Sequence, residues 1–520
     1  MGEQFDYVVV GSGSGGSVVA RRLVDAGARV AVIEAGGRDE APAIHDPGRW
    51  PELPFSATDW AWHTDPQEHC HGRRLFWPRG KVLGGTSTMN GMAYIRGHPL
   101  DFDGWAYHGC PGWSWQDVLP LFKRSEDCDR GETEYRGAGG PLHVTTRYEP
   151  HPVIGAMQEA AIEAGIPYND DHNGGPELDG VGPSQLTIKD GKRQTAAVAF
   201  LHPILDDPRL TVMTGARAIG LRFDGSRCTG VEISRDGELE TVEAAAEVIL
   251  SAGTIESPRL LMLAGIGPAE ELAEHGIASR VHLPGVGRNL HDHLIAPVLH
   301  ASPVEIPLVR PGLQHHHVHL FWRSRPGLRV PDTQPVGFHL PLGADWFEAP
   351  EHGWTWTAGL VRTQSRGQIR LTSADPTAPL SLDPRTFSVG ADLDALAAAV
   401  ELMREVANQP ALRPWLTGEL YPGPGVRTRE EVRDYVRRTV GSYHHQVGTC
   451  KMGQDEAAVV DPELRVHGVE GLRVADASVM PFITTGNTNA PTFMIGEKAS
   501  DLLLAARGSE VAGVSAARVP

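Results

Sequence analysis

The chain has 520 residues, of which 41% are hydrophobic and 22% charged, the composition of a globular protein with a sizeable core. At the usual ~100–200 residues per domain, this length indicates two or three structural units or one large two-lobed fold. Lysine and arginine number 47 and aspartate and glutamate 65, so the formal net charge is −18, which argues against nucleic-acid or anionic-membrane partners.

The five cysteines are scattered and never form a CxxC pair. The chain shows no signal-peptide pattern and no apolar run of ~18 residues. These features favour a reduced, cytoplasmic protein without an integral membrane segment.

Residues 6–34 have the pattern of a βαβ unit. Residues 7–10 form a short apolar run typical of a buried parallel strand, and residues 17–27 predict a helix that ends at Gly27. A second strand over residues 29–33 ends at Glu34. The order predicts the beginning of a doubly wound α/β domain.

The turn of this unit carries Gly11-x-Gly13-x-x-Gly16, the fingerprint of a dinucleotide site. The glycines permit a tight turn and close approach to a pyrophosphate, and Glu34 can accept hydrogen bonds from ribose hydroxyls. The alternative is a plain glycine-rich turn, but the flanking strand and helix favour nucleotide binding. The motif does not distinguish NAD from FAD.

A second cluster rich in glycine, serine and threonine covers residues 79–91. The residues alone leave two interpretations open. The cluster is either an ordinary loop or a segment that wraps a flat cofactor with its backbone donors.

The middle of the chain differs in composition from the N-terminal unit, which predicts a separate lobe. Residues 301–350 contain eight prolines, which predicts irregular or edge structure, because proline lacks the N–H that a sheet ladder needs. Residues 393–407 predict a helix with Leu396, Val400, Met403 and Ala407 on one face. In a strand, His315, His317 and His319 would share one face, but no carboxylate or cysteine accompanies them, so we expect no metal site.

Short apolar runs like those of the first unit occur again later in the chain. Residues 247–250 and 472–475 read as further buried strands. Residues 442–453 include two adjacent histidines as candidate acids or bases, of which at most one is expected to face a given site. Residues 485–492 precede a helix predicted over 493–504, so their polar side chains could equally serve as a helix cap. The chain is expected to fray after about Ala506.

Taken together, six motifs resemble the glucose-methanol-choline (GMC) family of flavoprotein oxidoreductases. They are GSGSGG with Glu34, RGKVLGGTSTMNGMAYIRGHPLDFDGW (79–105), VILSAGTIESPRLLMLAGIG (248–267), PGVGRNLHDH (284–293), HQVGTCKMG (445–453) and LRVADASVMPFITTGNTNAPTFMIGEKASDLL (472–503). They occur in the order of the family and extend over the whole chain.

The resemblance implies an α/β fold in which a Rossmann-like FAD-binding domain carries a sheet-based α+β substrate-binding cap. We expect residues 1–150, 190–296 and 441–510 to form the FAD-binding domain. Residues 151–189 and 297–440 would form the cap, and residues 511–520 a flexible tail.

The resemblance also assigns roles to individual residues. His445 matches the catalytic histidine of the family and Asn487 the second active-site position, while His444 is set aside. Val212 matches a residue whose backbone meets the adenine. The cofactor-binding positions are Gly11, Ser12, Gly13, Gly16, Glu34, Ala35, Arg79, Gly84, Gly85, Ser87, Asn90, Gly91, Met92, Ala93, Val212, Ala252, Gly253, Asp476, Ala477, Asn487 and Thr488.

One departure concerns the attachment of FAD. Some relatives bind it covalently through a histidine that this chain replaces by Met89, so we expect non-covalent FAD. The implied reaction is oxidation of a primary alcohol to the aldehyde, with electrons passed to O₂ or to a quinone or carrier protein. Choline dehydrogenase proper and a non-redox FAD-stabilised protein are the alternatives, and the protein would be a monomer or a homodimer.

Overall fold

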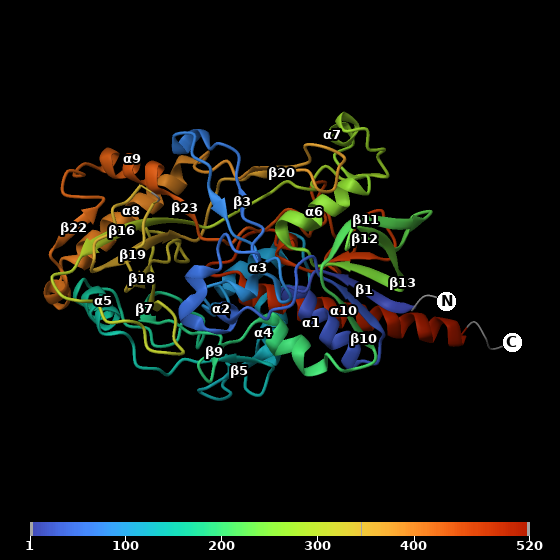
Figure 1. Ribbon diagram of the computed structural model, residues 1–520, viewed down its shortest axis with the longest axis horizontal. Coiled ribbons are helices and arrows are strands. Elements are labelled where there is room, and N and C mark those ends of the chain that lie inside the picture. The colour runs from blue at the N-terminus through green and yellow to red at the C-terminus, as the bar shows by residue number, and fades with distance from the viewer. Residues whose placement is uncertain (1–3, 345, 517–520) are drawn as a thin grey trace.

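Two large sheets lie at opposite ends of the molecule in the computed structural model, which describes residues 4–344 and 346–516, with side chains up to residue 508 (Figure 1). The start of β1 (Phe5–Val10) and the end of α10 (Asn489–Ala516) both lie at the end of the molecule that carries the first sheet. The segments that connect the sheets run between them.

The first sheet has a parallel core that the N-terminal unit begins. β1 (Phe5–Val10) pairs with β2 (Val30–Ile33) on one side and with β13 (Glu238–Leu250) on the other, and β10 (Leu210–Met213) and β24 (Leu472–Val474) extend it. Residues of β1 and β2 are almost all buried, as expected for strands covered on both faces.

Helices α1 (Ser14–Asp25) and α10 (Asn489–Ala516) pack against each other beside this parallel core. The sequence predicted both helices, but α10 begins earlier and continues to Ala516. The expected fraying after about Ala506 is therefore wrong for the backbone of residues 507–516, which is helical. The last four residues of the expected tail, 517–520, lie outside the described residues.

β13 is much longer than the strand expected at residues 247–250. Its first half pairs antiparallel with β12 (Arg227–Arg235), which in turn pairs with β11 (Ala216–Asp224). The first sheet thus joins a parallel core to an antiparallel meander.

The second sheet has the order β22-β16-β19-β18-β17-β7, and β23 (Gly441–Ser442) also pairs with β16. Helices α8 (Gly390–Ala407) and α5 (Pro152–Glu163) pack on it. The helix predicted at 393–407 is confirmed, with all four of the named residues buried. The strands are β7 (Gly180–Pro183), β16 (Leu294–Ala301), β17 (His316–Phe321), β18 (Val336–Phe338), β19 (Gly353–Leu360) and β22 (Gly418–Tyr421).

β17 and β18 correct the expectation of irregular or edge structure throughout residues 301–350. Both strands lie inside the sheet, with neighbours on each side. All eight prolines of the segment fall in the connections, so neither strand loses a ladder N–H.

His315, His317 and His319, at the start of β17 and within it, do not share one face as predicted. His315 and His317 lie near His339, with ring centroids 5.0 and 6.4 Å apart, whereas His319 contacts His316 and bonds to Ser184. The register with β18 shifts between His316 and Val318, and such a bulge breaks the alternation of side chains.

The remaining helices and short strands connect or cover the sheets. Within the described residues, no helix has the length and apolarity that a membrane span requires. These elements are α2 (Pro42–His45), α3 (Pro99–Tyr107), α4 (Trp115–Ser125), α6 (Gly253–Leu263), α7 (Ala269–Glu274), α9 (Arg429–Thr439), β3 (Trp62–His63), β4 (Phe76–Trp77), β5 (Glu126–Cys128), β6 (Leu142–Val144), β8 (Ile188–Lys189), β9 (Lys192–Arg193), β14 (Ile266–Gly267), β15 (Val281–His282), β20 (Gln368–Arg370) and β21 (Ser381–Asp383).

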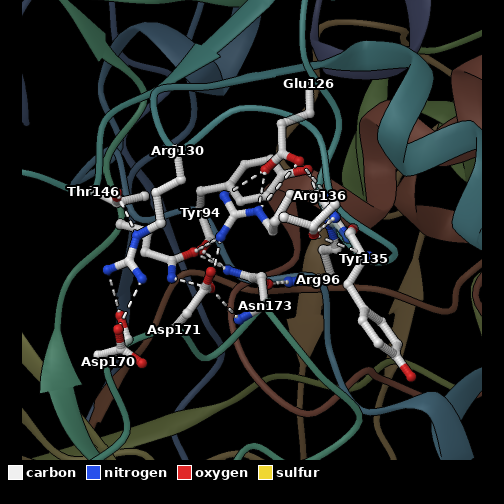
Figure 2. A network of polar contacts seen from close by, with 12 residues as sticks. Tyr94, Arg96, Glu126, Arg130, Tyr135, Arg136, Thr146, Asp170, Asp171 and Asn173 are labelled. Carbon is white, nitrogen blue, oxygen red and sulfur yellow. Dashed lines mark hydrogen bonds and ion pairs between the residues drawn. The ribbon is translucent and has the colours of Figure 1, made fainter.

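A buried ion network ties together segments that precede the second sheet (Figure 2). The Glu126 carboxylate accepts from Arg96 at 2.5 Å and from Arg136 at 2.6 Å, and all three side chains are at most 1% exposed. Arg136 also donates to Asp171 at 2.6 Å. Each of the two buried arginines therefore has a carboxylate partner.

Candidate active site

One cavity of about 700 Å³ extends from the glycine-rich turn after β1 to the segment around His445. Both large sheets contribute to its wall. Of the residues singled out in the sequence, it is lined by Gly11, Gly13, Glu34, Ala35, Arg79, Gly85, Asn90, Gly91, Met92, Ala93, Ala252, Gly253, His445, Asp476, Ala477, Asn487 and Thr488.

The glycine-rich turn forms a cradle in the wall of this cavity. Gly11 has a φ of +97°, and a Cβ there would lie 2.4 Å from the carbonyl oxygen of Ser251. A Cβ on Gly16 would lie 2.0 Å from the Gly11 carbonyl oxygen, so this glycine lets α1 pack on the turn. Gly13, by contrast, has no protein atom within 4 Å of its Cβ position, which leaves its cavity side open.

Glu34 is held rigidly at the end of β2. Its Oε2 accepts from the Ser12 hydroxyl at 2.6 Å, and its Oε1 accepts from the Gly36 N–H at 2.8 Å. Burial raises the pKa of this carboxyl above its usual range. Ser12 does not line the cavity itself but orients Glu34, which does.

The second glycine cluster packs directly on the first, so it is not an ordinary loop. The Gly84 N–H donates to the Ser12 hydroxyl at 3.0 Å, and a Cβ on Gly85 would lie 2.8 Å from the Gly13 Cα. The Ser87 hydroxyl closes the turn by donating to the Gly84 carbonyl at 2.6 Å. Gly84 and Ser87 therefore shape the segment from behind the cavity wall.

Val212 lies in β10, paired with Val32 of β2, and does not line the cavity. Its expected backbone contact with the adenine stays a prediction. The cavity is lined instead by Ala216, Arg217 and Ala218 at the start of β11. The next strand, which the sequence did not delimit, supplies this part of the wall.

Asp476 organises the wall beside the glycine-rich turn, where a Cβ on Gly15 would lie 3.5 Å from the Asp476 Cα. Its Oδ2 accepts from the Gly253 N–H at 2.9 Å and from the Ser257 hydroxyl at 2.6 Å. These bonds join the end of β24 to the start of α6, next to Ala252 and Ala477.

His445 stands at the other end of the cavity, between two polar partners. Its Nε2 lies 3.1 Å from the Nδ2 of Asn487, and its Nδ1 lies 3.0 Å from the Nδ1 of His293. The Tyr443 ring stacks on the imidazole at 4.8 Å. The backbone N–H of His445 donates to Asp292 at 2.9 Å, which fixes the chain at this position.

The hydrogen-bond network assigns the tautomer of His445. Gln334 Nε2 donates to Asn487 Oδ1 at 2.9 Å, so the amide nitrogen of Asn487 faces the histidine. Because that nitrogen donates, Nε2 of His445 carries a lone pair and Nδ1 carries the proton, which it donates to His293.

The surroundings keep His445 uncharged at neutral pH. Burial, and then the neighbouring His293, His444 and Arg79, lower the pKa of His445 well below 6.5. Nε2 is therefore an unprotonated nitrogen at the cavity, and its lone pair accepts from the Asn487 amide.

His444 also lines the cavity, but its backbone carbonyl accepts from Arg79 Nη2 at 2.6 Å, and its ring makes no hydrogen bond to the described residues. The partners of His445 were not predicted from the sequence. His293 and Asp292 belong to the PGVGRNLHDH segment, which was recognised without roles for them. Gln334 lies in the proline-rich stretch and carries no sequence signal.

The geometry agrees with the comparisons with known proteins. A GMC oxidoreductase N-terminal family model matches residues 5–295, and the C-terminal model of the same family matches residues 363–496. The chain belongs to the GMC oxidoreductase family.

Individual GMC relatives match over nearly the whole chain. An oxygen-dependent choline dehydrogenase from Brucella ovis is 41% identical, covering 96% of this chain and 95% of the relative. The solved pyridoxine 4-oxidase from Mesorbium loti is 34% identical with a TM-score of 0.92, covering 96% and 99%. A formate oxidase variant from Aspergillus oryzae RIB40 is 26% identical with a TM-score of 0.91, covering 98% and 99%. The GMC-type fold expected from the sequence is confirmed.

The residues present fit the FAD of a GMC oxidoreductase. The open side of Gly13 beside buried Glu34 suits a pyrophosphate and a ribose, and the cavity continues from there past residues 90–93 to His445.

Proposed function

We propose that this FAD-dependent alcohol oxidoreductase oxidises a primary alcohol to the aldehyde, with His445 as the general base and Asn487 as the donor to the substrate oxygen. The observation that carries the proposal is the lone pair of His445 Nε2 facing the cavity beside the Asn487 amide. When bound, FAD supplies the acceptor for the hydride that leaves the alcohol carbon.

In this mechanism the substrate hydroxyl enters between His445 Nε2 and Asn487 Nδ2. Nε2 takes the hydroxyl proton, which a positioned base accelerates by ~10²–10⁴-fold. The Asn487 amide donates to the oxygen as negative charge develops on it, and Gln334 holds that amide in place. His293 accepts from Nδ1 and keeps the proton there.

FAD is proposed to be bound without a covalent bond. Some relatives attach FAD through a histidine nitrogen. This chain has Met89 at that position, and a methionine thioether cannot form the same bond. Protein denatured in acid should release all of its flavin into the supernatant, and flavin that stays with the precipitated chain would contradict this assignment.

The compartment, the acceptor and the assembly are also proposals. All five cysteines are buried and unpaired, which supports a reduced cytoplasmic protein. O₂ and a quinone or carrier protein remain the two candidate acceptors, and a monomer and a homodimer the two candidate assemblies.

The deciding experiment is the visible spectrum of the anaerobic protein before and after addition of primary alcohols, followed by admission of air. Bleaching of the flavin by an alcohol supports the proposal. Recovery in air with formation of peroxide identifies O₂ as the acceptor, and slow recovery identifies another acceptor. A flavin that no alcohol bleaches favours the non-redox alternative.

A further inference from the structure

Arg193, on β9, differs from the other deeply buried arginines of the molecule. Its side chain is fully buried. Arg96, Arg136 and Arg259 are buried almost as completely, and each of them pairs with a carboxylate at a distance between 2.5 and 3.1 Å. No carboxylate among the described residues pairs with Arg193.

The guanidinium of Arg193 makes hydrogen bonds to uncharged atoms instead. Its Nε donates to the Ile44 carbonyl at 2.8 Å, and its Nη1 donates to the carbonyl and to Oδ1 of Asn90, the latter at 3.0 Å. Its Nη2 is buried without a hydrogen-bond partner among the described residues. Burial lowers the pKa of Arg193 to about 9, so the group stays charged at neutral pH.

A buried charge of this kind calls for an explanation. Buried charges in proteins are as a rule paired, because the interior does not replace the hydration that they lose. The missing partner of Arg193 therefore points to a countercharge that a bound molecule supplies.

Asn90 places this cation next to the cavity. Asn90 itself lines the cavity, so a single residue separates the guanidinium from the space that FAD fits. The Oδ1 of Asn90 accepts from the Met92 N–H at 3.0 Å as well as from Arg193. Two donors thus fix the orientation of this amide, with its nitrogen directed away from Arg193.

The hairpin that carries Arg193 is tied to the same segment. The Thr187 N–H donates to the Met92 carbonyl at 2.8 Å, and Ile188 of β8 pairs with Arg193 of β9. Arg193 does not line the cavity. It therefore holds a fixed place behind residues 90–92.

Reduction of the flavin creates a charge of the opposite sign. The hydride that leaves the alcohol carbon brings two electrons and one proton to the ring, and the hydroxyl proton leaves separately, to His445 in the proposed mechanism. A ring that takes up no further proton thus gains one negative charge. A cation fixed nearby in a water-poor site stabilises that charge without having to reorganise.

We propose that Arg193 is a positioning residue that, from behind Asn90, stabilises the negative charge of the reduced flavin and so raises the reduction potential of bound FAD. The inference rests on the proposed site, in which the flavin ring lies in the cavity between the turn at Gly13 and His445. A higher potential makes hydride transfer from the alcohol more favourable.

The first test measures the reduction potential of the unaltered FAD-loaded protein against that of free FAD in the same buffer. The protein is reduced anaerobically by a chemical reductant in the presence of a reference dye. We expect the bound flavin to lie at least ~30 mV higher, which for this two-electron couple means that reduced FAD binds at least ~10-fold more tightly than oxidised FAD. A bound potential equal to or below that of free FAD would overturn the inference.

This measurement does not depend on an alcohol. A raised potential in a protein whose flavin no alcohol bleaches would overturn the proposed function and leave the role of Arg193 in place. A flavin that alcohols bleach but whose potential is not raised would do the reverse.

Two variants separate the charge of Arg193 from its hydrogen bonds. Arg193→Met removes both, whereas Arg193→Lys keeps the charge and loses the planar fork. The potential should fall by at least ~30 mV in Arg193→Met and stay within ~15 mV, a ~3-fold change, in Arg193→Lys. Equal potentials in the two variants would overturn the role of charge. Arg193→Gln replaces Arg193→Met, with the same expectation, if the methionine variant does not retain FAD.

Arg473→Met is the matched control. Arg473 is also buried, but it pairs with Glu247 at 2.8 Å, and neither of these residues lines the cavity. Its loss should leave the potential within ~15 mV of the unaltered protein. A fall as large as that of Arg193→Met would show a general effect of removing a buried arginine and would overturn the inference.

Discussion

His445 illustrates how one side chain acquires a function from its neighbours. Alone, its ring would have a pKa near 6.5, but burial and the neighbouring groups keep it neutral, and the donor at Asn487 keeps Nε2 unprotonated. Among the described residues, no carboxylate bonds to the His445 ring itself; Asp292 binds only its backbone.

The base assignment makes a prediction about His445→Ala. Flavin reduction by a good alcohol should slow by ~10²–10⁴-fold, because the substitution removes the positioned base that takes the hydroxyl proton. FAD content, read from the visible spectrum, should stay at the wild-type level. His444→Ala is the matched control and should slow the step by less than ~10-fold, and a reversed order would contradict the choice between the two histidines.

Gln334 is predicted to act through Asn487 rather than on the substrate. Gln334→Leu removes the donor that orients the amide, at a cost typical of one hydrogen bond, so flavin reduction should fall by ~5–10-fold. The same substitution in an Asn487→Ala background should have no further effect. Additive losses in the double variant would show that Gln334 has a role of its own.

At the scale of elements, the two glycine clusters form one structure. The turn after β1 and residues 84–87 interlock through Ser12 and through the close approach of Gly13 and Gly85. The sequence predicted the first cluster from its strand-turn-helix context, but it left the second open, because only the packing of the two shows that both belong to the cavity wall.

Gly11 and Gly13 allow folding to be separated from cofactor binding. Gly11→Ala places a methyl group 2.4 Å from a carbonyl oxygen at a positive φ, so the protein should lose stability and flavin together. Gly13→Ala meets no protein atom, so the apoprotein should keep its melting temperature while its affinity for FAD, measured by fluorescence titration, falls by at least ~10-fold. Unchanged affinity in Gly13→Ala would exclude this turn as the cofactor cradle.

The second sheet shows a limit of pattern-based prediction at the same scale. Eight prolines suggested irregular structure for residues 301–350, yet β17 and β18 are interior strands. Composition averages over a window, whereas the sheet only requires that prolines avoid the ladder positions, and here they do.

For the whole molecule, the buried network around Glu126 is predicted to be a major determinant of stability. Glu126→Gln would leave Arg96 and Arg136 without a full countercharge in a dry site, and breaking such a pair costs ~3–5 kcal/mol. The control is Asp170→Asn, whose carboxylate is 63% exposed in its pair with Arg130 and should change stability by less than ~1 kcal/mol. Chemical denaturation followed by tryptophan fluorescence measures both, and similar midpoints would contradict the role of burial.

The molecule should also become less stable in mild acid. Burial lowers the pKa of His293, His300 and His316 to about 3 and of His172 and His317 to about 4. Since these histidines regain a pKa near 6.5 on unfolding, the unfolded chain binds more protons, and stability falls as the pH drops from about 6.5 toward 4.

Denaturation midpoints at pH 7.5, 6.0 and 5.0 should therefore decrease steadily. Each such histidine contributes up to ~1.4 kcal/mol per pH unit within this window. His300 stacks on Trp354 and does not line the cavity. In His300→Asn, the free energy of unfolding should therefore depend less steeply on pH, because unfolding takes up about one proton fewer. A midpoint that stays constant down to pH 5 would contradict the assignment.

The sequence by itself determined the family, the cofactor class and the βαβ unit at the start, and it predicted the pair His445 and Asn487, whose side chains lie 3.1 Å apart. These features depend on local patterns, on glycines with required backbone geometry, and on motifs that keep their order along the chain. Most of the cofactor positions that it named line the cavity, but Ser12, Gly16, Gly84, Ser87 and Val212 do not.

Only the tertiary structure decided which groups act on those residues. His293 lies 152 positions from His445 and Gln334 lies 153 from Asn487, and no local pattern couples positions so far apart. The neutrality of His445 is likewise a property of distant segments packed together. Long-range packing sets local charge and burial, and these set the protonation state of the proposed base.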